Sequence, residues 1–199
     1  MFNTTAYIER SLFDKSTHDQ IVRFLDEWIP LTPTDNDFGW SPEARFNRRY
    51  LHNSPFLVQI HHQLTDYACQ VFQEKVKPSY VFLSMYEKDG NCPLHVDRPQ
   101  CRYTIDYLIR QEQEHPWPIA IGPVMPDDER YSLATTQPVG DEKTKIIEDT
   151  NWSVCELSEN DAVCYSGTHC WHYRPRPSDG KADLAFFHFV PEGFDGPLA

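Results

Sequence analysis

The sequence lacks the features that point to a membrane or to an oxidising compartment. Its longest apolar runs, such as residues 184–187, are far shorter than the roughly 18 residues that a bilayer-spanning helix needs. No basic segment followed by an apolar one stands at its start, so no secretory signal is expected. Its six cysteines include no C-x-x-C pair, which argues against common zinc and redox motifs. We therefore expect a cytoplasmic protein with no membrane contact and with reduced, mostly buried thiols.

Positive charge is also scarce. Lys and Arg together number 18 against 30 Asp and Glu, which gives a net charge of -12. Phosphate backbones and anionic membrane surfaces repel such a chain, so nucleic acid is disfavoured as a partner. A length of 199 residues fits one domain with one core. We expect a single domain over residues 1–199, with a helical N-terminal support (1–78), a β-rich core (79–190) and a C-terminal tail (191–199).

Two segments of the N-terminal support have helical periodicity. In the first, Ser16 and Asp19 form a loose capping pair and Pro30 marks the end of the helix. In the second, Ser54 is the expected cap and Pro55 occupies the first helical position, ahead of one apolar face. The pattern therefore predicts two helices before the β-rich core.

Two other segments are rich in polar and turn-forming residues. Residues 32–53 are expected to form a loop that carries three candidate substrate-binding residues, Trp40, Arg48 and Arg49. The arginines suit an acidic or carboxylate-bearing substrate, and the alternative is that they balance neighbouring acids at the surface. Residues 126–151 are expected to form a long excursion with one or two short strands. Loops of this kind are candidates for lids over a site.

From residue 79 onward the apolar pattern changes to a period of two. Short β-branched and aromatic runs are separated by Gly, Pro and Asp, which is typical of strands. Many short strands without intervening helices indicate a sandwich or barrel, with the two helices packed outside. The predicted strands lie at 79–87, 102–109, 118–122, 152–157, 161–167 and 182–190.

The triplet His95-x-Asp97 lies between the first two of these strands. Residues i and i+2 of an extended segment share a face, so the two side chains can offer a nitrogen and an oxygen to one cation. Such a triplet is expected about once by chance in a chain of this composition. Taken alone, it favours an exposed strand end over half of a metal site.

A second cluster, beyond the intervening strands, completes a possible metal site. His169 and His172 are candidate third ligands, and Arg174, Arg176 and Lys181 supply positive charge nearby. Two histidines and one carboxylate leave three positions open on a metal, which suits iron(II) that must bind a co-substrate and oxygen together. A nearby cation would then hold the far carboxylate of the co-substrate.

The order and spacing of these residues resemble the iron(II)- and 2-oxoglutarate-dependent dioxygenases, particularly the prolyl-4-hydroxylase-like branch. The resemblance covers about residues 79–190 and implies a double-stranded β-helix, the jelly-roll or cupin-like barrel. The pattern is Tyr86-x3-Gly90-x4-His95-x-Asp97, an aromatic strand with Tyr107, the turn Ser166-Gly167, then His172 and, nine positions later, Lys181.

The resemblance implies a role for each matched residue. His95, Asp97 and His172 would bind Fe(2+), with His169 as the alternative to His172. The Lys181 ammonium would pair with the C5 carboxylate of 2-oxoglutarate, with Arg174 and Arg176 as rivals. The aromatic rings of Tyr86 and Tyr107 would line the 2-oxoglutarate pocket, and Tyr103 and Ile105 would share the face of Tyr107.

The implied activity is hydroxylation of a small molecule with release of succinate and CO2. An amino acid or another carboxylate-bearing metabolite is the expected substrate, and ascorbate is a candidate additional reductant. Three alternatives stay open: a prolyl-type hydroxylase of protein side chains, a metal dioxygenase that uses no 2-oxo acid, and a non-catalytic cupin-like binding module.

Overall fold

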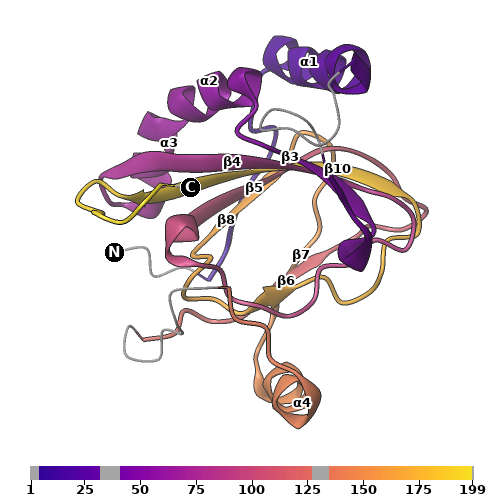
Figure 1. Ribbon diagram of the computed structural model, residues 1–199. Helices are drawn as coiled ribbons and strands as arrows, with labels where there is room; N and C mark the ends of the chain where they lie inside the picture. Colours follow the sequence, from indigo (N-terminus) through magenta and orange to yellow (C-terminus); the bar gives the residue numbers. More distant parts are fainter. Residues whose placement is uncertain (1–4, 32–40, 127–134, 199) are drawn as a thin grey trace.

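Two antiparallel β-sheets face each other in the structure, a computed structural model that describes residues 5–31, 41–126 and 135–198. The larger sheet has the strand order β1-β8-β5-β10-β4-β3-β2, and the smaller one has the order β7-β6-β9 (Figure 1). This is the jelly-roll arrangement, and the mainly β fold with flanking helices is confirmed. The strands are β1 (Tyr7–Glu9), β2 (Ser41–Glu43), β3 (Arg48–His52), β4 (Val76–Tyr86), β5 (Tyr103–Glu112), β6 (Ile119–Ile121), β7 (Ser153–Cys155), β8 (Ala162–Tyr165), β9 (His172–Tyr173) and β10 (Lys181–Pro191).

Three helices cover the outer face of the larger sheet, and a fourth lies beyond the smaller sheet (Figure 1). None of the described helices is long and apolar enough to cross a membrane. The helices are α1 (Lys15–Arg23), which continues into a π-helical turn (Phe24–Trp28) and a 3-10 turn (Ile29–Leu31), α2 (Pro55–Gln63), α3 (Thr65–Phe72) and α4 (Gly140–Asp149); two further 3-10 turns span Ala44–Phe46 and Pro99–Cys101.

The caps of the N-terminal helices correct one prediction and match another. At the start of α1 the carboxylate of Asp14 accepts a hydrogen bond from the amide of Thr17 at 2.9 Å, so Asp14 is the cap and Ser16 lies inside the first turn. At the start of α2, Ser54 occupies the N-cap position and Pro55 the first helical position, as predicted. The predicted second helix is divided at Leu64 into α2 and α3.

The segments predicted as a loop and as a strand-bearing excursion are both different in the structure. Residues 41–52 contain β2 and β3, because Arg48–His52 pairs along β4 and this pairing outweighs the local turn-forming composition. The excursion contains helix α4, whose first turn carries Asp141 and Glu142 at the positive end of the helix dipole. The N-terminal part is therefore not purely helical, since β1, β2 and β3 join the larger sheet.

The larger sheet separates two apolar layers because side chains alternate along each strand. On β5, Tyr103, Ile105 and Tyr107 pack with the helices, whereas Leu108 packs between the two sheets. This alternation decides which residues of β5 and β10 can face a site between the sheets.

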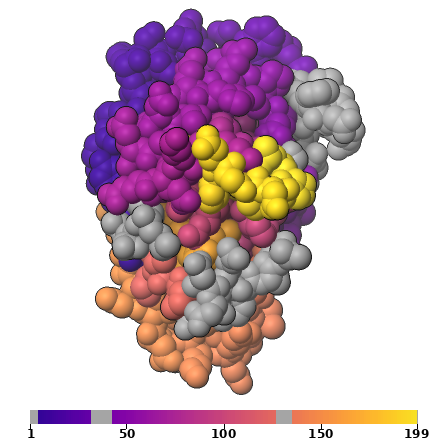
Figure 2. All heavy atoms as spheres, turned by 90° about the vertical axis from the view of Figure 1, so that its left-hand side faces the viewer, coloured from indigo at the N-terminus to yellow at the C-terminus, as the bar shows by residue number. Residues whose placement is uncertain are grey.

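The chain after β10 folds back onto the molecule. Lys77 donates a hydrogen bond through Nζ to the carbonyl of Phe194 at 2.8 Å, and Gln100 donates through Nε2 to the carbonyl of Pro197 at 3.1 Å. Figure 2 shows this segment, in yellow, lying against the purple N-terminal half.

Candidate metal centre

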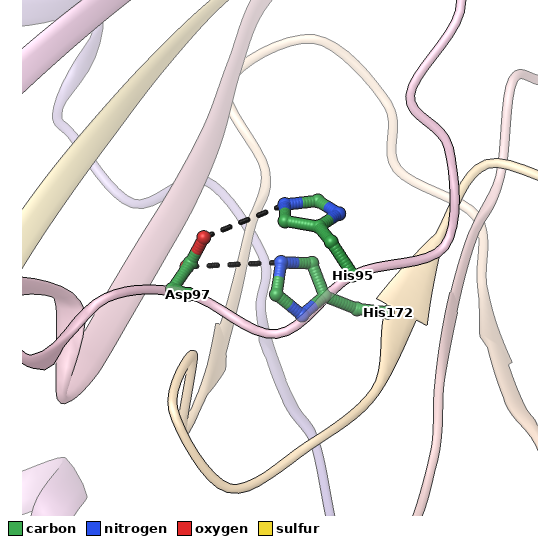
Figure 3. Close-up of side chains that lie close together, drawn as sticks. All are labelled: His95, Asp97 and His172. Carbon is green, nitrogen blue, oxygen red and sulfur yellow. Dashed lines mark ion pairs between the residues drawn. The ribbon is translucent and has the colours of Figure 1, made fainter. Parts of the chain in front are cut away.

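Three side chains from two segments of the chain, residues 95–97 and strand β9, converge between the two sheets (Figure 3). Nε2 of His95 lies 3.4 Å from Oδ1 of Asp97, and Nε2 of His172 lies 3.7 Å from Oδ2 of the same carboxylate. One donor atom from each residue lies within 4.8 Å of the other two, as around a single cation. The structure thus brings together the three residues that the sequence nominated as ligands.

The backbone holds the two histidines opposite each other. His95 donates its amide to the carbonyl of His172 at 3.0 Å, and His172 donates its amide to the carbonyl of His95 at 2.9 Å. The segment that carries His95 therefore extends the smaller sheet at β9 by one bridge. The amide of Asp97 donates to the carbonyl of Gly167 at 2.8 Å, which ties the carboxylate to the turn after β8.

Hydrogen bonds at Nδ1 decide the tautomer of both imidazoles. Nδ1 of His95 donates to the carbonyl of Pro93 at 2.8 Å, and Nδ1 of His172 donates to the carbonyl of Cys170 at 2.9 Å. A carbonyl oxygen can only accept, so Nδ1 carries a proton, and in the neutral imidazole the lone pair is on Nε2. Each Nε2 faces Asp97, and hydrogen bonds of this kind at the far ring nitrogen orient the histidines of metal sites.

The electrostatics of the cluster favour the protonation states that bind a cation. Burial acts to raise the pKa of Asp97, but His172 and His95 outweigh it and lower this pKa to about 2. Burial, and then the neighbouring His95, lowers the pKa of His172 to about 4. At neutral pH the cluster therefore contains a carboxylate and a neutral His172, and this donor set of two imidazoles and one carboxylate fits iron(II).

A cavity of about 300 Å³ opens beside the cluster, between the two sheets. Its walls include two buried groups of opposite charge: Nη2 of Arg174 lies 3.2 Å from Oδ2 of Asp106. Burial raises the pKa of Asp106 to about 6, although Arg174 acts to lower it. Aromatic rings make up much of the remaining wall, from Tyr80, Phe82, Tyr86, Tyr165 and Phe186.

A second arginine enters this cavity from the edge of the larger sheet. Arg48, on β3, bonds through Nε to Glu43 at 2.7 Å and through Nη1 to the hydroxyl of Tyr86 at 2.9 Å. Trp117 packs against both Tyr86 and Arg174: its ring is 4.9 Å from that of Tyr86 and 4.3 Å from the guanidinium carbon of Arg174. Arg48 and Arg174 therefore approach Tyr86 from the two sheets.

Lys181 was expected to pair with the C5 carboxylate of 2-oxoglutarate, but its position in the structure does not fit that role. Lys181 is exposed at the start of β10 and lines a separate hollow near Arg110 and Asp183. The side chains of β10 that face the metal cluster are Phe186 and His188, which are on the opposite face of the strand. Among the described residues around the cavity, the rival anchor Arg174 is present and Lys181 is not.

The expectation for Tyr107 is wrong for the same reason. Its ring packs with the helices, and its hydroxyl lies 2.6 Å from Nδ1 of His18. Because faces alternate along β5, the opposite face from Tyr107, with Asp106 and Thr104, is the one that points toward the cavity. The other predicted co-substrate residue, Tyr86, does line the cavity.

The remaining candidates divide between the cavity and the surface. Of the predicted substrate-binding residues, Arg48 lines the cavity, Arg49 pairs with Glu87 at 3.5 Å on the other face of β3, and Trp40 lies outside the described residues. Arg176 bonds to backbone carbonyls and to Asp179 away from the cluster. His169 bonds to Thr168 at 2.6 Å and is not part of the three-ligand group.

Several cavity residues were missed by sequence reasoning. Arg98, His52, His188 and Asp106 line the cavity, and none of them was among the predicted site residues. A correct choice of the inward face of β5 would have found Asp106, but no sequence signal identifies His52, which depends on the unpredicted strand β3.

Solved structures with the same fold include several non-heme oxygenases. HygX from Streptomyces hygroscopicus, with nickel, 2-oxoglutarate and hygromycin B bound, has a TM-score of 0.65 and 12% identity over 96% of this chain and 85% of its own. EctD from S. alaskensis, with bound Fe, has a TM-score of 0.71 and 12% identity over 98% and 76%. SnoK, an alpha-ketoglutarate-dependent carbocyclase from nogalamycin biosynthesis, has a TM-score of 0.70 and 8% identity over 95% and 80%.

These comparisons show that the chain has the fold of iron- and 2-oxoglutarate-dependent oxygenases. The predicted resemblance is thus confirmed at the level of the fold, and the prolyl-4-hydroxylase-like branch stays a prediction. No protein-family model and no curated protein sequence matches the chain.

Proposed function

We propose that this protein is an iron(II)- and 2-oxoglutarate-dependent oxygenase that hydroxylates a small molecule and releases succinate and CO2. The observation that carries the proposal is the cluster of His95, Asp97 and His172, with both Nε2 lone pairs directed at one carboxylate and a cavity beside it. Iron bound there supplies oxidation by O2 coupled to decarboxylation of the 2-oxo acid. The similar fold of enzymes solved with Fe or with 2-oxoglutarate supports the same cofactor and co-substrate.

We assign the far carboxylate of 2-oxoglutarate to Arg174, with Arg48 and the Tyr86 hydroxyl beside it. Arg174 is two residues beyond His172, a spacing of about 6 to 7 Å in extended chain, which matches the length of a five-carbon dicarboxylate. Its guanidinium is held in place by Asp106 and by the ring of Trp117. A planar guanidinium can grip a carboxylate through two parallel hydrogen bonds, which an ammonium cannot do.

The cavity supports a small substrate. At about 300 Å³ it is at the lower end of the range for ligand pockets, and the co-substrate must occupy part of it. Arg98, next to the ligand Asp97, gives the wall a further positive charge and suits a carboxylate-bearing molecule. HygX and EctD were solved with hygromycin B and with 5-hydroxyectoine, which supports small-molecule chemistry on this fold.

The described residues contribute positioning and exclusion of water. The cluster would hold the cation at the cavity wall, and aromatic rings of Tyr80, Phe82 and Phe186 surround the space where a substrate would lie. An apolar lining of this kind restricts the access of bulk water to the site. Asp97 would supply the carboxylate ligand of the metal.

The test is an anaerobic titration followed by exposure to oxygen. Purified protein receives iron(II), ascorbate and 2-oxoglutarate, and a weak metal-to-ligand charge-transfer band is sought in the visible region. Oxygen is then admitted and succinate is measured, with a panel of small amino and carboxylic acids as substrates. Absence of both the band and succinate would overturn the proposal.

A further inference from the structure

Asp97 belongs to a second set of possible metal ligands besides the one described above. The Sγ of Cys101, a ring nitrogen of His188 and a carboxylate oxygen of Asp97 all lie within 4.8 Å of one another. Cys101 ends the 3-10 turn that follows Asp97, and His188 is on β10 next to a β-bulge at His188/Phe189. The three donors come from two separate parts of the chain, so only the tertiary fold assembles them.

Both new donors have partners that orient them. Nδ1 of His188 is hydrogen-bonded to the hydroxyl of Thr104 at 3.0 Å. This bond turns the opposite side of the imidazole, with Nε2, away from Thr104. Sγ of Cys101 is 2.9 Å from the hydroxyl of Tyr80, which can donate to a metal-bound sulfur. Supporting bonds of this kind are what holds the ligands of metal sites in place.

The second set is accessible from the cavity but is otherwise enclosed. Asp97 and His188 line the cavity wall, whereas Cys101 is only 2% exposed and is not part of that wall. A cation in the cavity can therefore reach the carboxylate and the imidazole first and then the sulfur. Cys92 also lines the cavity but belongs to neither donor set, which makes it a matched control.

The two sets differ in the metal that they favour. His95, Asp97 and His172 offer nitrogen and oxygen, which suit iron(II). Replacing one imidazole by a thiolate shifts the preference toward thiophilic cations, because sulfur, nitrogen and carboxylate oxygen are the usual ligands of Zn2+. Each bond of such a site is about 2.0 to 2.3 Å long, so two donors of one tetrahedral ion lie roughly 3.3 to 3.8 Å apart. Donors within 4.8 Å of one another reach this spacing by small movements of the side chains.

We propose that Asp97, Cys101 and His188 form a second metal site, selective for thiophilic divalent cations such as Zn2+. Binding forms a metal–sulfur bond, and the proton of the Cys101 thiol leaves to solvent. Because the two donor sets share Asp97, a cation in the second site competes with iron for this carboxylate. The site therefore makes zinc an antagonist of iron loading.

Cobalt(II) is the probe that separates the two sites. Bound to thiolate sulfur it gives an intense sulfur-to-cobalt charge-transfer band in the near ultraviolet, whereas bound to nitrogen and oxygen alone it does not. We expect the band in the wild-type protein, at one cobalt per chain. We expect Cys101→Ser to abolish it, Cys92→Ser to retain it, and His172→Ala to retain it, since His172 belongs only to the iron set.

The outcomes decide the proposal independently of the oxygenase activity. Absence of the band in wild-type protein, its survival in Cys101→Ser, or its loss in Cys92→Ser would each overturn the second site. Crystals of the wild-type protein soaked in Zn2+ give a test that requires no variant. An anomalous peak bonded to Cys101 and His188 supports the site, and a peak only at His95 and His172 overturns it.

Discussion

The amide of Asp97 donates to the carbonyl of Gly167 at 2.8 Å, and the two residues are packed so closely that glycine is required. A Cβ at Gly167 would lie 2.5 Å from Oδ2 of Asp97 and 2.5 Å from the carbonyl oxygen of Cys101. The turn after β8 therefore restricts the position of the carboxylate that both donor sets share.

Gly167→Ala should accordingly displace Asp97 and weaken iron binding by at least tenfold. We also expect a loss of about 1 to 3 kcal/mol in the free energy of unfolding, since the added methyl group overpacks a rigid contact. Anaerobic iron titration and chemical denaturation measure the two effects. Gly193→Ala is the control, because a Cβ there meets nothing within 4 Å; equal behaviour of the two variants would contradict the packing argument.

Removal of the Asp97 carboxylate should impair iron binding far more than removal of an exposed carboxylate. Asp97→Ala takes away the only acidic ligand of the iron set, so we expect loss of measurable iron(II) binding and of succinate formation with folding retained. Circular dichroism checks the fold. Asp141→Ala, on the exposed side of α4, should leave iron binding unchanged. Undiminished iron affinity in Asp97→Ala would exclude the assigned centre.

Substitutions of Arg174 and of Lys181 should differ sharply in their effect on the KM for 2-oxoglutarate. Lys181→Ala removes an exposed side chain outside the cavity, so its KM for 2-oxoglutarate should equal that of the wild type. Arg174→Ala should raise this KM by at least tenfold. It should also destabilise the fold by about 3 to 5 kcal/mol, because it leaves Asp106 buried without its partner.

Folding and binding can be separated in the arginine variant. Arg174→Met combined with Asp106→Leu removes both buried charges, so stability should return toward the wild-type value while the raised KM remains. If Lys181→Ala raises the KM and the arginine variants do not, the anchor is Lys181 after all. Initial rates of succinate release measure the KM.

Acid sensitivity should depend on His61, a buried residue of α2. His61 is 2% exposed beside the rings of Phe187 and Phe189, and burial, aided by His188, lowers its pKa from 6.5 to about 3. Below pH 6.5 His61 becomes protonated in the unfolded chain but stays neutral in the folded one. The contribution of His61 to stability is therefore full above that pH and falls as the pH drops toward 3. The shift corresponds to a loss on the order of 5 kcal/mol.

His61→Leu should therefore flatten the dependence of stability on pH between about 6.5 and 3. Urea unfolding at a series of pH values measures the slope. His62→Leu, at the exposed neighbouring position, should keep the wild-type slope. An unchanged slope in His61→Leu would show that other groups cause the acid sensitivity.

Local sequence was sufficient for the long strands of the β-rich core and for the candidate ligands of the metal cluster. Alternating apolar runs predict β4, β5, β8 and β10 because side-chain alternation is a property of the extended chain itself. The His-x-Asp spacing likewise places two donors on one face of an extended segment. The two predicted helices near the N-terminus follow from the same local periodicity.

Tertiary structure alone decided what surrounds the cluster. Which face of β5 and β10 points inward depends on where the helices pack. Asp106 and His188 therefore line the cavity, and Tyr107 and Lys181, which were expected there, do not. Strand β3 exists because β4 offers it unpaired backbone groups, and it brings Arg48 to the site. The period of the apolar residues and the spacing of the candidate ligands can be read from the sequence. Which face of a strand points inward is decided only when the two sheets and the helices pack together.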